Sequence, residues 1–182
     1  MQFRSNGFTL VELMVTIAVL AILLAIAAPS FSDTAERRAL QGTADSVVAV
    51  IGAAKSEAVK RNALVKVDFK AVGTGFCVGA GIVATTSAAG CDCSTTTCPL
   101  GRFPSNGNEL RTVKLTEAAK FGSATSFVID PRTGMLADDS SAGSVKLEVP
   151  RGYGLEIKVN SMGRASQCAP SGKKALPGMG AC

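Results

Sequence analysis

A continuous apolar segment near the N-terminus constrains this 182-residue chain more than any other feature. Residues 13–28 contain no charged side chain. As an α-helix, residues 8–28 would span about 30 Å, which is the thickness of the hydrocarbon core of a bilayer. Arg4 precedes the segment and supplies the positive charge expected on the cytoplasmic side. We therefore predict a membrane-spanning helix. A cleaved secretory signal is the alternative, although Pro29 and a further helical pattern follow the small residues at 25–28.

Glu12 places one carboxylate near the start of this apolar segment. A carboxylate inside a bilayer costs about 2.5–3.5 kcal/mol, and such a residue normally faces a partner instead of lipid. No Lys or Arg lies one helical turn away from Glu12. We expect a chain terminus or another chain to neutralise it. A position among the lipid headgroups is the alternative.

The helical pattern continues beyond Pro29 as a single apolar stripe with helical spacing, formed by Val47, Val50, Ile51, Ala54 and Ala58. This pattern predicts one long helix over about residues 8–61. We expect it to bend near Pro29, because proline removes a backbone hydrogen bond. The first half would anchor the chain and the second half would pack under a globular domain.

The remaining sequence predicts an antiparallel sheet. Alternating or apolar runs that are typical of strands occur at residues 64–69, 76–83, 110–115, 126–130, 144–149 and 154–159. Residues 131–134 predict a turn, and residues 73–101, which hold four cysteines, combine a strand with a long loop. We therefore predict an α+β fold, with a long bent helix packed against an antiparallel β-sheet head.

The absence of histidine narrows the kinds of catalytic and metal sites that the chain can form. It removes histidine-based catalytic triads and histidine metal sites, so we expect no enzyme and no cofactor. The chain also has no Trp and only one Tyr, which argues against a groove that stacks bases. The acidic pair Asp138 and Asp139 offers too few oxygen ligands for calcium, so we expect no metal there.

Six cysteines favour disulfides formed in an oxidising compartment: Cys77, Cys91, Cys93, Cys98, Cys168 and Cys182. A zinc site at Cys91, Cys93 and Cys98 is the alternative, but their spacing differs from paired C-x-x-C knuckles. We predict a Cys168–Cys182 bridge and two bridges among the other four cysteines, whose pairing the sequence leaves open.

The N-terminal motif GFTLVELM at residues 7–14, followed by Pro29, resembles the class III signal of type IV pilins and pseudopilins. The resemblance implies cleavage after Gly7 by a prepilin peptidase, which also methylates the new Phe8 amine. It further implies that Glu12 pairs with the Phe8 amine of a neighbouring subunit during filament assembly. Such a pair would set the axial register of the packing helices.

Three later segments resemble the GspH/FimT group of minor pilins and pseudopilins: residues 55–62, 127–134 and 157–164 with Cys168. The resemblance implies a type IV minor pilin that acts at the filament tip or in its initiation, with a type II secretion pseudopilin as the alternative. It divides the chain into a leader (1–7), a transmembrane and filament-core helix (8–30), an amphipathic stem (31–62) and a β-rich head (63–182). The subunit would sit in the bacterial inner membrane as a single-pass protein, with its head in the periplasm, before joining the pilus at the cell surface.

The C-terminal residues 157–182 carry four cations and no acid: Lys158, Arg164, Lys173 and Lys174. We expect the Cys168–Cys182 loop to present the two adjacent lysines near Arg164. Some FimT-type minor pilins bind DNA through a Gly-Arg-x-Arg element, and Gly163-Arg164-Ala165-Ser166 retains only its first arginine. The resemblance implies phosphate-directed binding of double-stranded DNA, in which the lysines replace the lost charge. Cations that only keep the loop soluble are the alternative.

Overall fold

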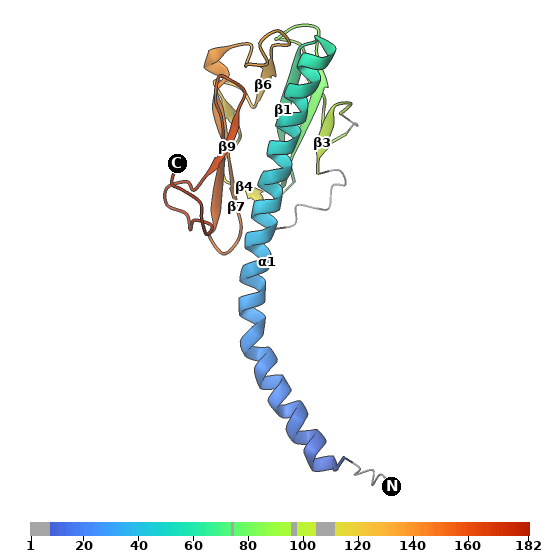
Figure 1. Cartoon of the computed structure of the whole chain (residues 1–182), viewed down its shortest axis with the longest axis vertical. Helices are drawn as coiled ribbons and strands as arrows, with labels where there is room; N and C mark the ends of the chain where they lie inside the picture. The colour runs from blue at the N-terminus through green and yellow to red at the C-terminus, as the bar shows by residue number, and fades with distance from the viewer. Residues whose placement is uncertain (1–7, 74, 96–97, 105–111) are drawn as a thin grey trace, which may run out of the picture. The chain divides into compact units, whose positions relative to one another are not determined.

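The computed structural model describes residues 8–73, 75–95, 98–104 and 112–182, except for the side chains of residues 27–30. The chain divides into two compact units, Met1–Ala35 and Glu36–Cys182. Helix α1, Leu10–Arg61, contributes to both units (Figure 1).

The first unit consists mainly of the N-terminal part of α1. The Thr9 hydroxyl accepts the Glu12 backbone N–H at 3.2 Å and caps the first turn. By length and composition, no single helix in the described ranges is long and apolar enough to cross a membrane. The bent pair Leu10–Ile26 and Phe31–Arg61 meets that requirement when its two segments are taken together.

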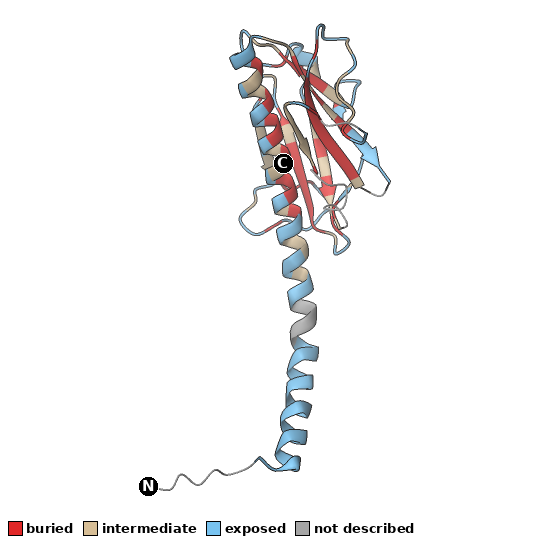
Figure 2. Cartoon of the chain, turned by 90° about the vertical axis from the view of Figure 1, so that its right-hand side faces the viewer, coloured by how far each residue is buried: buried red, intermediate tan, exposed pale blue. Residues whose placement is uncertain are grey.

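In the second unit, α1 buries one face against the strands (Figure 2). All five residues of the predicted stripe, Val47, Val50, Ile51, Ala54 and Ala58, are buried. The stripe also extends toward the N-terminus through Leu40 and Ala44, at the same helical spacing. The helix ends at Arg61, and Asn62 adopts a left-handed conformation with φ 49° that stops it.

Two antiparallel sheets complete the second unit. The first has the order β3-β2-β1-β6, with bounds Gly101–Phe103, Gly75–Ile82, Val65–Val72 and Ser126–Ile129. The second has the order β4-β7-β8-β9, with bounds Lys114–Leu115, Gly143–Glu148, Gly154–Val159 and Ala165–Cys168. Strand β5, Lys120–Phe121, also pairs with β7, and a short 3-10 helix, η1, covers Asp139–Ser141.

One hydrophobic core joins α1 to both sheets. Phe121 of β5 stacks on Phe69 of β1, with ring centroids 5.3 Å apart, and also packs against Phe127 of β6 at 4.8 Å. These rings connect the two sheets because their strands alternate apolar residues toward the core. The fold is therefore the predicted α+β arrangement of a long helix followed by antiparallel sheets.

The strand predictions are confirmed in part. Five of the predicted strands correspond to β1, β2, β6, β7 and β8, and no end differs by more than three residues. Of the run predicted at 110–115, residues 110 and 111 lie outside the described residues, and the described part forms only β4. The sequence prediction missed β3, β5, β9 and η1. The predicted turn at 131–134 is present, closed by a 2.9 Å hydrogen bond from the Gly134 N–H to the Asp130 carbonyl.

Candidate functional site

The N-terminal part of α1 presents apolar side chains on all sides. Exposed fractions range from 51% to 74% for the large apolar residues Phe8, Leu10, Val11, Leu13, Met14, Val15, Ile17, Val19, Leu20, Ile22, Leu23, Leu24 and Ile26. Glu12 is exposed among them, and no cation in the described ranges pairs with its carboxylate. Gly7, the predicted cleavage position, lies outside the described residues. The helix surface and Glu12 are thus free to meet lipid or another chain.

The cysteine-rich loop after β2 is held against the outer face of the first sheet. The Cys77–Cys93 disulfide attaches it to β2, and the Cys91–Cys98 disulfide closes the loop on itself, which settles the pairing that the sequence left open. The sulfur atoms lie directly over Gly79, where a Cβ atom would stand 2.4 Å from the Cys98 Sγ. The glycine at this position is what allows the loop to approach the strand so closely.

Polar side chains of β1 anchor the same loop. Lys66 donates to the Ala88 carbonyl at 2.9 Å, and Lys70 donates to Asp92 at 2.6 Å. The hydrogen bonds from Lys70 and Ser94 hold the pKa of the Asp92 carboxyl well below its usual range. The loop is therefore fixed by two disulfides and an ion pair, and its cysteines are structural.

The third disulfide, Cys168–Cys182, folds the C-terminal loop over the outer face of the second sheet. It is the bridge expected from the sequence. Of the four predicted DNA-binding cations, three are engaged along this loop. Lys158 donates to the Cys182 carbonyl at 3.1 Å, Lys173 pairs with Glu148, and Lys174 lies 5.7 Å from the centre of the Tyr153 ring.

Arg164 lies at the opposite end of β8 from the two lysines, so the expected cluster of Arg164 with Lys173 and Lys174 does not form. Lys174 is hydrogen-bonded to Gly152, next to the start of β8, whereas Arg164 is bonded to Asn160, just beyond its end. At about 3.3 Å per residue, the ends of this strand lie roughly 17 Å apart. The expectation failed because β9 runs antiparallel to β8 and carries the chain back along it before the lysines are reached.

Arg164 has other cations as neighbours. It is exposed in the turn between β8 and β9, and this turn packs on the predicted turn at 131–134. A Cβ at Gly163 would lie 3.1 Å from the Gly134 carbonyl oxygen, and Lys55 donates to the Met162 carbonyl at 2.8 Å. Arg132, in the second turn, is exposed as well. Sequence reasoning missed this grouping because its members come from three distant segments.

Asp138 and Asp139 serve a local structural role. The Asp138 carboxylate caps η1 by accepting the Ser140 backbone N–H at 3.1 Å and the Ser140 hydroxyl at 2.5 Å. These hydrogen bonds lower the pKa of Asp138. The Asp138 carboxylate is therefore engaged in capping the turn.

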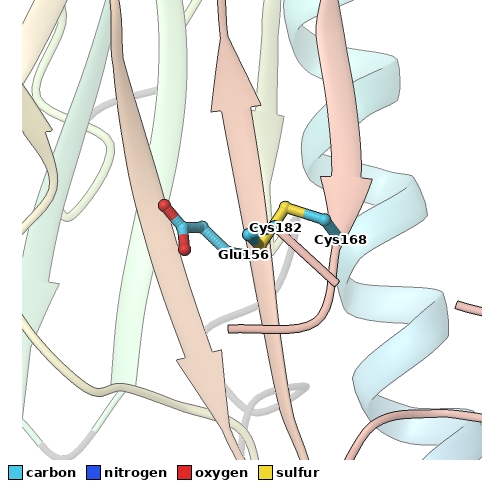
Figure 3. A group of neighbouring side chains, drawn as sticks. All are labelled: Glu156, Cys168 and Cys182. Atoms are coloured by element: carbon cyan, nitrogen blue, oxygen red, sulfur yellow. A yellow bond between two sulfur atoms is a disulfide. The ribbon is translucent and has the colours of Figure 1, made fainter. Parts of the chain in front are cut away.

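Glu156 is the acidic residue that sequence reasoning overlooked. It lies on β8 beside the C-terminal disulfide, and its carboxylate oxygen and the two sulfur atoms are within 4.8 Å of one another (Figure 3). The sulfur atoms form a disulfide, so the three groups are not a metal site. The alternation of β8 predicts an outward Glu156, but no local signal predicts that a loop covers it.

A long apolar helix with one exposed carboxylate near its start, followed by an α+β head, defines the class of type IV pilin-like subunits. Residues 2–28 match the family model for the prokaryotic N-terminal methylation motif, and residues 43–163 match the model for type II transport protein GspH. The chain belongs to the GspH family. No curated protein and no solved structure matches it.

The protein is thus a type IV minor pilin or pseudopilin of the GspH/FimT kind, a structural class and not an enzymatic one. Its methylation motif implies processing by a prepilin peptidase and assembly with pilin or pseudopilin subunits. The same motif indicates an anchor in the inner membrane.

Proposed function

We propose that the chain is a minor pilin of a type IV pilus, placed at the tip or used in initiation of the filament. Before assembly, residues 8–30 anchor it in the inner membrane and the head faces the periplasm. The observation that carries this proposal is the predominantly apolar surface of α1 from Leu10 to Ile26, on which Glu12 is the only charged side chain. A helix that is apolar on all sides needs lipid or neighbouring helices around it.

Glu12 can set the axial register in which these helices pack. After cleavage behind Gly7, the Phe8 amine is a cation one turn away from the carboxylate, and it can pair with Glu12 of a neighbouring subunit. An unpaired carboxylate in an apolar bundle is costly, so this pair favours one axial register. The same residues carry the leader, anchor and assembly roles proposed for residues 1–30.

The test compares Glu12→Ala and Glu12→Gln with the wild-type chain in a cell that assembles the filament. Both variants should be cleaved and retained in the membrane, because the apolar span is unchanged. Both should be depleted at least about tenfold from sheared filaments, since one charge pair contributes a tenfold or larger preference. Thr16→Ala, also on the exposed helix but without a charge, is the matched control. Normal incorporation of the two Glu12 variants would refute the register argument.

A type II secretion pseudopilin is the alternative, and deletion of the chain separates the two machines. Loss of surface pili with normal export of secreted enzymes supports the pilus. Loss of export with intact pili supports the secretion system. The Glu12 test applies equally to both.

DNA capture is the second candidate function, and the exposed turns that carry Arg132 and Arg164 favour it. These arginines and Lys55 belong to contacting segments, whereas Lys158, Lys173 and Lys174 are already engaged. Titration of the full chain with duplex DNA at two salt concentrations tests it. Arg164→Ala and Arg132→Ala should each reduce the slope of log affinity against log salt by about 0.9. Lys173→Ala with Lys174→Ala should change it little. If only the lysine variant loses binding, DNA binds along the C-terminal loop; if no DNA binds, the cations serve solubility.

A further inference from the structure

The C-terminal loop encloses a cavity of about 720 Å³ against the outer face of the second sheet. The loop is held at two places. The Cys168–Cys182 disulfide and a 3.0 Å hydrogen bond from the Cys182 N–H to the Ala169 carbonyl join its two ends. Hydrogen bonds between Lys174 and the backbone of residues 152 and 154 hold its middle. A cavity of this size, framed in this way, falls in the range of preformed ligand sites.

Glu156 lines this cavity from β8, and more than nine-tenths of its surface is buried, with 8% exposed. Figure 3 shows its side chain beside the disulfide. Within the described ranges, no hydrogen bond or ion pair reaches this carboxylate. Its oxygens are not sealed from solvent, so the carboxylate is open to a ligand in the cavity that supplies charge or hydrogen-bond donors.

The lysines around the cavity are directed to other acceptors. Lys146 faces Glu156 across the β7–β8 pairing, but its Nζ lies 3.8 Å from a Glu117 oxygen. Lys173 pairs with Glu148, and Lys158, the next outward residue of β8, donates to the Cys182 carbonyl. Glu156 is therefore the acceptor that the cavity leaves open.

The rest of the lining is largely apolar and includes Ala169, Pro170, Ala175, Met179 and Ala181. An occupant that matches these surfaces has an aliphatic stem and a cationic head that donates hydrogen bonds. A guanidinium meets both requirements, because its planar fork binds a carboxylate through two N–H groups. The volume also exceeds that of one side chain, which leaves room for the peptide that carries it.

We infer that the cavity under the C-terminal loop binds an arginine side chain of a partner protein, with Glu156 as its acceptor. The residues that form the site all lie within the unit Glu36–Cys182. The inference is independent of the proposed function, because it requires neither a filament nor DNA.

Methionine methyl NMR of the full chain in detergent micelles tests this binding directly. Met179 lines the cavity, while Met135 and Met162 lie elsewhere on the head and serve as internal controls in the same spectrum. Titration with N-acetyl-arginine amide should shift Met179 saturably, with a Kd on the order of 1 mM for a ligand of this size. N-acetyl-citrulline amide, the neutral isostere, should bind at least about tenfold more weakly.

Glu156→Gln should weaken arginine binding by at least about tenfold, whereas Glu57→Gln, the same change on a distant carboxylate of α1, should leave it unchanged. The inference is overturned if the Met179 methyl signal does not shift, if the citrulline amide binds as tightly as the arginine amide, or if Glu156→Gln retains the wild-type affinity. If Glu156→Gln also shifts the methyl signals of Met135 and Met162 before any ligand is added, the substitution has changed the fold. The comparison of arginine with citrulline on the wild-type chain then decides the inference.

Discussion

Replacing Gly79 by alanine tests how closely the cysteine-rich loop packs on β2. The added Cβ would lie 2.4 Å from the Cys98 Sγ and 2.9 Å from the Cys91 Sγ. Normal contacts begin near 3.4 Å, so the disulfide must move by about 1 Å, and overpacking of this kind costs typically 1–3 kcal/mol. Because the loop is also bonded to Cys77 of β2, we expect the upper end of that range.

The free energy of unfolding can be measured by pulse proteolysis of the full chain in urea. A loss of about 3 kcal/mol corresponds to a fall in melting temperature of about 6–12 °C for a unit of this size. Gly52→Ala is the matched control, because nothing lies within 4 Å of its added Cβ and the residue is in α1. That change should stabilise the helix by about 0.5–1 kcal/mol.

A second background isolates the steric cause. In a Cys91→Ala, Cys98→Ala chain, both sulfur atoms nearest to Gly79 are absent, and the cost of Gly79→Ala should fall to about 1 kcal/mol. The reasoning is refuted if Gly79→Ala is as stable as the wild type, or if its cost is the same in both backgrounds.

Three further predictions concern stability. Burial raises the pKa of the Asp68 carboxyl. The protonated carboxyl therefore contributes its full share to the free energy of unfolding below the unfolded pKa, and this share is lost as pH rises through the folded pKa. In urea titrations, the free energy of unfolding of the wild type relative to Asp68→Asn should fall between pH 3 and pH 7. Gly163 has φ +68° and little room for a Cβ, whereas Gly178 has φ +78° and open space. Gly178→Ala should therefore lower the free energy of unfolding by about 1–2 kcal/mol, and Gly163→Ala should lower it by more. Equal costs would contradict the contact between Gly163 and Gly134. Cys168→Ser with Cys182→Ser opens a loop with a sequence separation of 14, and should lower the free energy of unfolding by about 3 kcal/mol. An unchanged urea midpoint would show that backbone hydrogen bonds alone hold the loop.

Patterns that repeat along the chain were predictable. The stripe from Val47 to Ala58 and the alternation in β1 and β8 follow from the geometry of a helix and a strand, which fix which side chains share a face. Strands of two or three residues, such as β3 and β5, have no such period. They form because a neighbouring strand supplies their hydrogen-bond partners, and this information is absent from their own residues.

The grouping of charges could not be predicted in the same way. The distance between Arg164 and Lys173 depends on the length of β8 and on the path of the C-terminal loop back along it. The contact between the turns at Gly134 and Gly163 depends on how both sheets pack on α1. Proximity between distant segments is a property of the packed core.

The sequence by itself determined the apolar N-terminal helix with its single carboxylate, the α+β class, and the match to the pilin-like signal, because each of these is written in consecutive residues. Only the tertiary structure decided how the four clustered cysteines pair, which cations stay exposed, and that Glu156 is buried without a partner. The physical reason is that burial and pairing are set by what covers a residue. For Glu156 the cover is a loop closed by a disulfide, whose residues begin more than ten positions further along the chain.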